Sequence, residues 1–139
     1  MCIRDRENHC AEVINLSFRL ITNPKAGEVS IALIDDVEMT ELNSAYRGIN
    51  APTNVLSFPD HGPALVLGDI VISYDKVTAE AVRDGKSQKD HLTHLLIHGF
   101  LHLQGYEHEI DSDAEQMEAL EIKILTQLDI DNPYQIIEP

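Results

Sequence analysis

The sequence predicts an α+β domain in which a small mixed β-sheet packs against helices. β-forming residues dominate three earlier segments of the chain, and helical apolar spacing dominates three later ones. The strands are predicted at 28–34, 55–58 and 65–73, and the helices at about 74–83, 88–104 and 112–128. Strands that precede helices in this way are typical of α+β domains. The chain has 139 residues, 43% of them apolar, which suits a single hydrophobic core.

The N-terminal part begins with a segment of unusual character. Residues 1–8 show no alternation that could form a strand. We therefore expect an atypical leader there, foreign to the domain or left by truncation, and a single domain over 9–139. Residues 9–21 have helical apolar spacing, and Asn23 and Pro24 form a helix stop.

The connection between the first two strands is predicted to contain a turn and a short helix. Asp35 and Asp36 follow the strand at 28–34 and are expected to make the turn. Thr40 is expected to cap the helix or lie in its first turn, and the helix should continue through Tyr46.

Three histidines in the helix at 88–104 and just after it have the spacing of a metal site. His98 and His102 are four residues apart, so a helix places them on one face. Gly105 can adopt a left-handed conformation, which lets His108 turn back toward the pair. Three imidazoles leave a fourth tetrahedral position open, as in catalytic zinc sites.

The alternative reading of each histidine is an ordinary core or surface residue. Five of the seven histidines fall between His91 and His108, however, in an otherwise apolar helix where unpaired imidazoles would be costly. The same spacing occurs in metzincin peptidases, but those enzymes have a glutamate directly after the first histidine, where this chain has Gly99. Glycine cannot accept a proton, so a peptidase is the weaker hypothesis.

Four blocks of the sequence together resemble one known family. The blocks are HGFLHLQGYEH at 98–108, LNSAYR at 42–47, PTNVLSFP at 52–59 and LGDI at 67–70. This combination resembles the YbeY endoribonucleases, the bacterial rRNA maturation factors, in the same order and over residues 28 to 128. Two departures are small, since Gln104 stands where the family commonly has Leu and Glu107 where it commonly has Asp.

The resemblance implies a zincin-like zinc helix and one Zn²⁺ per chain, held by His98, His102 and His108. It implies a single-strand-specific endoribonuclease that matures the 3′ end of 16S rRNA and acts in ribosome quality control, with His98 and Arg47 in the catalytic site. The implied partners are single-stranded rRNA, the small ribosomal subunit with its proteins, and a ribosome-associated GTPase. Attack on phosphorus by water and attack by the 2′-hydroxyl both stay open. A metzincin-like peptidase and a non-catalytic ribosome assembly factor with a structural zinc remain the alternatives.

Further side chains are expected near this site. Arg47 would hold the scissile phosphate through its planar guanidinium, and Asn54 and Ser57 would line the same groove. Glu107 and Asp111 flank His108 and are candidates to accept a hydrogen bond from a ligand's free N–H.

The last predicted helix is expected to have one buried and one solvated face. Met117 belongs to its apolar repeat and is predicted to lie in the core. Glu115, Glu118 and Glu121 are predicted to form the solvated face.

The charge of the chain disfavours extensive contact with RNA. A net charge of −14 repels phosphates, so an RNA site must be a local basic patch. Lys76, Arg83, Lys86 and Lys89 fall in one stretch ahead of the histidine helix, and with Arg47 and the metal they could form one. The chain shows no apolar leader, no stretch long enough to span a membrane, and only two cysteines. These features favour the cytoplasm.

Overall fold

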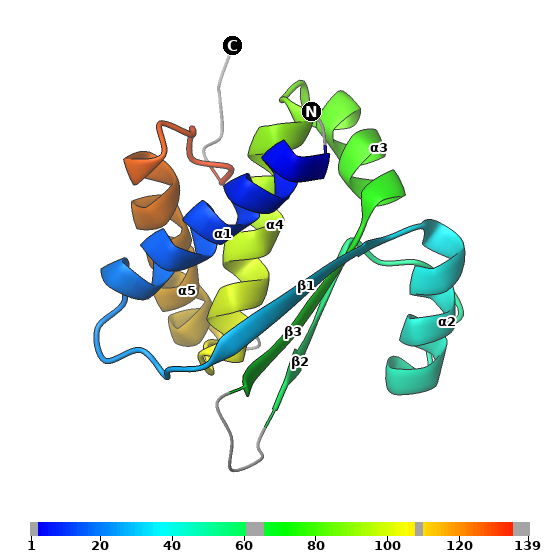
Figure 1. Cartoon of the computed structure of the whole chain (residues 1–139), viewed down its shortest axis with the longest axis horizontal. Coiled ribbons are helices and arrows are strands. Elements are labelled where there is room, and N and C mark those ends of the chain that lie inside the picture. The colour runs from blue at the N-terminus through cyan, green and yellow to red at the C-terminus, as the bar shows by residue number, and fades with distance from the viewer. Residues whose placement is uncertain (1–2, 61–65, 108–109, 135–139) are drawn as a thin grey trace.

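The computed structural model describes residues 3–60, 66–107 and 110–134, and over these ranges the chain forms helices around a small sheet (Figure 1). The elements are α1 (Ile3–Leu20), β1 (Glu28–Ile34), α2 (Asp36–Arg47), β2 (Val55–Pro59), β3 (Val66–Ser73), α3 (Tyr74–Asp84), α4 (Gln88–Leu103) and α5 (Asp111–Gln127). None of these helices combines the length and apolarity that crossing a bilayer requires, within the described ranges.

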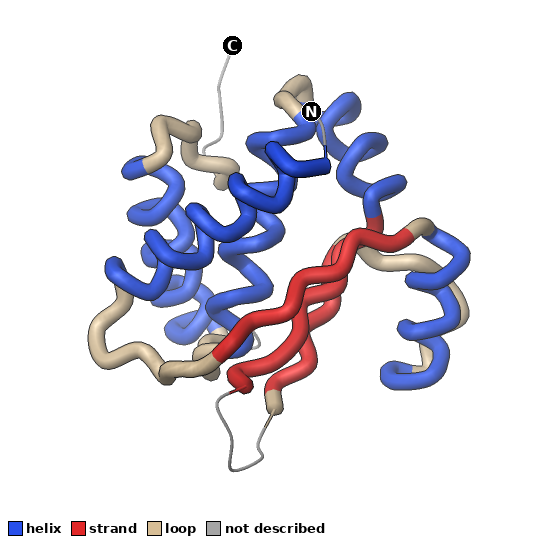
Figure 2. Tube along the Cα trace, viewed as in Figure 1, coloured by secondary structure: helices blue, strands red, loops and turns tan. Residues whose placement is uncertain are grey.

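The sheet is mixed, as the sequence predicts. Its strand order is β1-β3-β2, with β1 parallel and β2 antiparallel to β3. Figure 2 shows the strands in red, with α1, α4 and α5 on one side and α2 on the other. Side chains of β3 alternate accordingly, because Ile70 and Ile72 join the larger core whereas Val71 packs with Met39 of α2. The predicted α+β class is confirmed.

Helix α4 lies at the centre of the larger core. Ten of its sixteen residues are buried, and it contacts α1, α3, α5, β2 and β3. Phe100 is fully buried and meets Phe18 of α1 edge to face, with ring centroids 4.7 Å apart. Ser87 caps the helix by accepting a hydrogen bond from the Asp90 N–H at 3.0 Å. A side chain on α4 is therefore held by a backbone that is packed on several sides.

Two boundaries differ from the sequence prediction. Helix α1 starts at Ile3 and not near His9, because residues 3–8 are rich in helix-forming Arg and Glu, and the Arg6 guanidinium stacks 5.3 Å from the centre of the Tyr74 ring. Asp35 and Asp36 do not make a turn. Asp35 is the N-cap of α2, where its carboxylate accepts from the Glu38 N–H at 2.9 Å, and Asp36 is the first helical residue.

Candidate metal and active site

Four histidines form a row along α4, and two of them face each other closely. His91, His94, His98 and His102 follow one another with ring centroids 6.3, 6.5 and 4.6 Å apart. The Nε2 atoms of His98 and His102 are only 3.1 Å apart. Residues four apart on a helix lie on one face, which explains why this pair meets.

The hydrogen bonds of the other ring nitrogens determine what the two Nε2 atoms can do. His98 Nδ1 lies 2.7 Å from Glu121 Oε1, and His102 Nδ1 lies 2.9 Å from the carbonyl oxygen of Tyr106. A carbonyl and an ionised carboxylate can only accept, so both Nδ1 atoms carry the proton. In neutral rings both Nε2 atoms then present a lone pair, and these two atoms face each other.

Two facing lone pairs repel unless a cation lies near both of them. Two Zn–N bonds of about 2.0–2.1 Å at a tetrahedral angle place their nitrogens about 3.3 Å apart. The observed 3.1 Å is close to that spacing. The donors of His98 and His102 therefore fit a metal ion, and their tautomers are already those that ligation requires.

The predicted third ligand, His108, lies outside the described residues. The chain up to that point behaves as predicted, because α4 ends at Leu103 and Gly105 adopts a φ of +96°. Among the residues that the structure describes, no three His, Cys, Asp or Glu side chains are grouped so as to hold a metal. The role of His108 stays a prediction.

Glu121 corrects the prediction of a solvated face on the last helix. Its side chain is fully buried, and it contacts His94, His98 and Tyr134 through hydrogen bonds. Burial alone would raise the pKa of Glu121, but these hydrogen bonds lower it to about 2. The carboxylate is thus ionised inside the protein.

The helical repeat contains a signal for Glu121 that the sequence analysis missed. Met117 is four residues earlier and buried, as predicted, and Ile124 and Leu125 follow on the same face. A glutamate on an apolar face needs a partner, and the histidines of α4 provide it.

The residues expected to support a ligand are more exposed. Glu107 Oε2 lies 3.6 Å from His102 Nδ1, but the Tyr106 carbonyl is closer, and 61% of the Glu107 side chain is exposed. Asp111 is exposed in the first turn of α5. Their proposed contacts with a metal ligand remain predictions.

Gly99 faces the sheet. A Cβ atom at this position would lie 2.9 Å from Ile70 Cγ2 and 3.1 Å from Ser57 Oγ. Ser57 also donates a hydrogen bond from its hydroxyl to the Gly99 carbonyl at 2.9 Å. Gly99, which occupies the position of the metzincin general base, therefore packs directly on β2 and β3, and a glutamate side chain would not fit there.

The three residues predicted to bind substrate have different surroundings. Arg47 is exposed in the last turn of α2, across the sheet from α4 (Figure 1). Its neighbour Tyr46 packs on Phe58 of β2, with ring centroids 5.0 Å apart. Asn54 donates from Nδ2 to Glu80 Oε1 at 3.1 Å, and the Ser57 hydroxyl is engaged by Gly99. No hydrogen bond joins Arg47 to the α4 histidines within the described ranges.

The predicted basic patch does not gather around the histidine pair. Lys89 precedes His98 by nine residues on α4, which corresponds to about 14 Å along the helix axis at about 1.5 Å per residue. Arg83 pairs with the adjacent Asp84, with Nε 2.9 Å from Oδ1. The stretch that contains these residues therefore lies toward the other end of α4.

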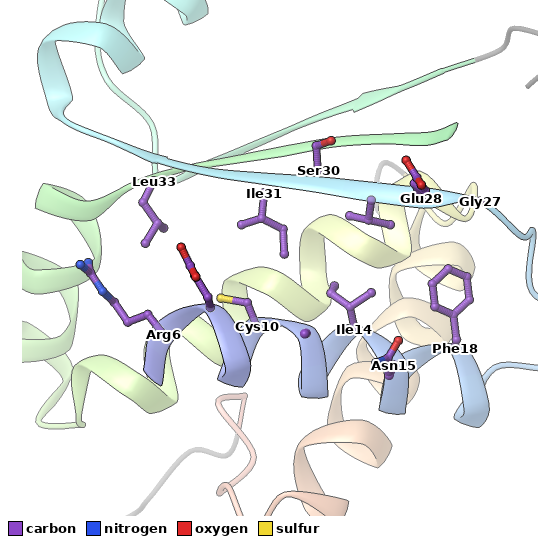
Figure 3. Close-up of a pocket in the computed structure, with 13 residues that line it drawn as sticks. Arg6, Cys10, Ile14, Asn15, Phe18, Gly27, Glu28, Ser30, Ile31 and Leu33 are labelled. Atoms are coloured by element: carbon purple, nitrogen blue, oxygen red, sulfur yellow. The ribbon is translucent and has the colours of Figure 1, made fainter. Parts of the chain in front are cut away.

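A groove of about 710 Å³ lies between α1 and β1, away from this site. Figure 3 shows Cys10, Ile14 and Phe18 of α1 pointing toward Ile31 and Leu33 of β1. Strand β1 pairs with β3 on one side only, so its other edge borders the groove. No α4 histidine is among the described residues that line the groove.

Comparison with known proteins identifies close relatives. The family model described as endoribonuclease YbeY matches residues 3–129. An endoribonuclease YbeY of Methylocella silvestris is 53% identical over 111 residues, which cover 78% of this chain but only 63% of the relative. Its counterpart in Bartonella quintana is 48% identical over 113 residues, which cover 77% of this chain and 72% of the relative.

A solved structure agrees with these sequence matches. The solution structure of TM1509 from Thermotoga maritima resembles this fold with a TM-score of 0.57 and 25% identity, covering 94% of this chain and 91% of that one. The resemblance inferred from the four sequence blocks is thus confirmed, and the chain belongs to the YbeY family.

Proposed function

We propose that this protein is a zinc-dependent endoribonuclease that cleaves single-stranded RNA during maturation of the 3′ end of 16S rRNA. The observation that carries the proposal is the pair of Nε2 atoms on His98 and His102, 3.1 Å apart, in two rings whose Nδ1 atoms each lie against an oxygen acceptor. Membership of the YbeY family adds the reaction class, because the relatives are named endoribonucleases. A role in ribosome quality control belongs to the same proposal.

His98 and His102 would hold the zinc, with His108 as the third ligand. When bound, zinc acts as a Lewis acid on phosphoryl oxygen and lowers the pKa of water. Glu121 and the Tyr106 carbonyl keep the two described imidazoles in the tautomer that exposes Nε2. The protein thus keeps two donors pointed to one place before any substrate arrives.

Arg47 would hold the phosphate. Arginine presents parallel N–H groups that match two phosphate oxygens, and its charge offsets negative charge that builds up at phosphorus. The end of α2 packs on β2 through Tyr46 and Phe58. The preceding residue of β2, Ser57, contacts Gly99 beside His98. These contacts connect the end of α2 to α4 through β2, and the Arg47 guanidinium is proposed to reach past β2 toward the histidines.

The packing of Gly99 argues against a metzincin-like peptidase. A glutamate general base has no space at this position, because a Cβ alone would meet Ile70 and Ser57 within 3.1 Å. The hydrolysis of a peptide bond would therefore lack the base that metzincins use.

The net charge of −14 suggests how the RNA reaches the site. A strongly acidic body has weak intrinsic affinity for a polyanion, so a ribosomal partner is expected to position the substrate. Proteins of the small subunit and a ribosome-associated GTPase are the proposed partners, and the cytoplasm is the proposed location.

Metal analysis combined with RNA cleavage tests the proposal. The wild type should carry one zinc per chain and cleave a single-stranded RNA, whereas His98→Ala should lose both because a ligand is missing. His9→Ala is the matched control, since His9 lies on α1 and its ring is hydrogen-bonded to Thr93 of α4 at 2.6 Å. A wild type that cleaves RNA without zinc, or a His98→Ala variant that keeps tight zinc and full cleavage, would refute the assignment.

A further inference from the structure

A buried carboxylate behind the histidine pair accepts hydrogen bonds from three side chains. Glu121 Oε1 lies 2.7 Å from His98 Nδ1, and Oε2 lies 3.1 Å from His94 Nε2. Oε2 also accepts a short hydrogen bond from the hydroxyl of Tyr134, in the segment that follows α5. Both oxygens are therefore satisfied, although the side chain is only 1% exposed.

This arrangement gives the two histidines different roles. His98 donates a hydrogen bond from Nδ1 to Glu121, and its Nε2 atom faces His102. His94 donates a hydrogen bond from Nε2 to the same carboxylate. Its Nδ1 atom is buried without a hydrogen-bond partner among the described residues. His94 thus has no ring nitrogen directed at the His98–His102 pair, and it contacts Glu121 from the neighbouring helical turn.

The Glu121 side chain is fixed by contacts from several segments of the chain. Its backbone belongs to α5, its partners His94 and His98 belong to α4, and Tyr134 approaches from beyond α5. The Tyr134 ring also meets the His94 ring edge to face, with centroids 5.7 Å apart. A carboxylate held from three directions has little freedom, so the His98 ring that donates to it is held as well.

We propose that Glu121 is a positioning residue of the metal site: it fixes the ring and tautomer of His98, while His94 and Tyr134 hold Glu121 in place. The inference rests on the proposed function in assuming that His98 binds metal. Its chemistry is that of a carboxylate that accepts the distal N–H of a ligating imidazole, which orients the ring and increases its basicity.

Glu121→Gln tests the inference with almost no change in shape. The amide keeps one oxygen acceptor and replaces the other with an NH2 donor, so it can accept from His98 only if His94 and Tyr134 change from donors to acceptors. Part of the His98 population should change to the Nε2–H tautomer, which removes the lone pair that faces His102. Zinc should bind about 10–100-fold more weakly. Glu115→Gln, an exposed position on the same helix, is the matched control and should match the wild type.

Two measurements read out this change. Long-range ¹H–¹⁵N NMR spectra of the metal-free protein report the tautomer of His98, and competition with a chelator reports the dissociation constant for zinc. The wild type should show His98 protonated on Nδ1. Unfolding would also release His98 from its Nδ1–H tautomer, so the spectra are compared only for a variant that keeps the wild-type fold and Tm.

The outcomes separate this inference from the proposed function. A wild type with His98 protonated on Nε2 overturns the inference even if Glu121→Gln fails to fold. Unchanged tautomer and zinc affinity in a folded Glu121→Gln variant also overturn it, and leave the proposed function standing. If the wild type binds no zinc, the proposed function fails, while the Nδ1–H tautomer and its loss in Glu121→Gln still support Glu121 as the group that orients His98.

Discussion

Replacing Gly99 by alanine sets two known effects against each other. Alanine in a helix interior is favoured over glycine by about 1 kcal/mol, so helix propensity alone predicts a more stable protein. The new Cβ, however, would lie 2.9 Å from Ile70 Cγ2 and 3.1 Å from Ser57 Oγ. Ile70 is fully buried on the central strand and β-branched, so it cannot easily move aside.

The structure allows the net effect to be worked out. Overpacking a tight core costs about 1–3 kcal/mol, and weakening the Ser57–Gly99 hydrogen bond costs up to about 1 kcal/mol. After the gain in helix propensity is subtracted, these figures leave a fall of about 0–3 kcal/mol in the free energy of unfolding, and we expect a value near the middle, about 1–2 kcal/mol. For a chain of this size that corresponds to a decrease in Tm of about 3–10 °C.

Urea unfolding and thermal melts of the metal-free protein measure this change. Ala119→Gly, at an exposed position inside α5, is the control that gives the glycine–alanine difference in this protein, and it should also destabilise by about 1 kcal/mol. Both substitutions should thus destabilise the protein, although one replaces glycine by alanine and the other replaces alanine by glycine. A Gly99→Ala variant as stable as the wild type, or more stable, would refute the claim that Gly99 is required by the contact between α4 and the sheet.

Two further predictions concern Arg47 and His91. Arg47→Ala should lower RNA cleavage by about 10²–10³-fold. Because the side chain is exposed, the free energy of unfolding should change by less than about 0.5 kcal/mol. Arg47→Lys should restore cleavage only in part, and cleavage at the wild-type rate by Arg47→Ala would refute a role of Arg47 in catalysis. Burial lowers the pKa of His91 below 6.5 despite its hydrogen bond to Glu80, so the unfolded chain binds this proton more readily and stability should fall as the pH drops below about 6.5. Unfolding curves between pH 5 and 8 check this, and His91→Gln should flatten the dependence, whereas an equally steep dependence in that variant would exclude His91 as its source.

Much of the fold could be predicted because its signals are local. Alternation and helical spacing placed the strands and the three later helices to within about two residues, since each element buries one face. The start of α2 was missed because Asp35 can cap a helix or open a turn, and only the Glu38 N–H at 2.9 Å decides between them. Helix α1 begins six residues before the predicted start, because its first turns have no apolar repeat; among the described residues, Arg6 of this segment contacts the Tyr74 ring.

The sequence predicts only the part of the candidate site whose residues lie on a single helix. The spacing of His98 and His102 is sufficient to bring their rings together. The buried Glu121 belongs to a different helix and follows His98 by 23 residues in the sequence. No pattern within α5 predicts which helix this side chain will contact. Arg47 depends on how α2 docks across the sheet, which spacing does not determine either.

The central position of α4 would link occupancy of the proposed zinc site to the integrity of the whole core. The helix that carries His98 and His102 is also the one that α1, α3, α5 and the sheet enclose. A ligand that binds only the folded state stabilises it, by about 4 kcal/mol when its concentration is a thousand times its dissociation constant. Cooperative unfolding of α4 would then separate His98 from His102 and release the metal. A zinc-sensitive dye could serve as a probe of global denaturation in this protein.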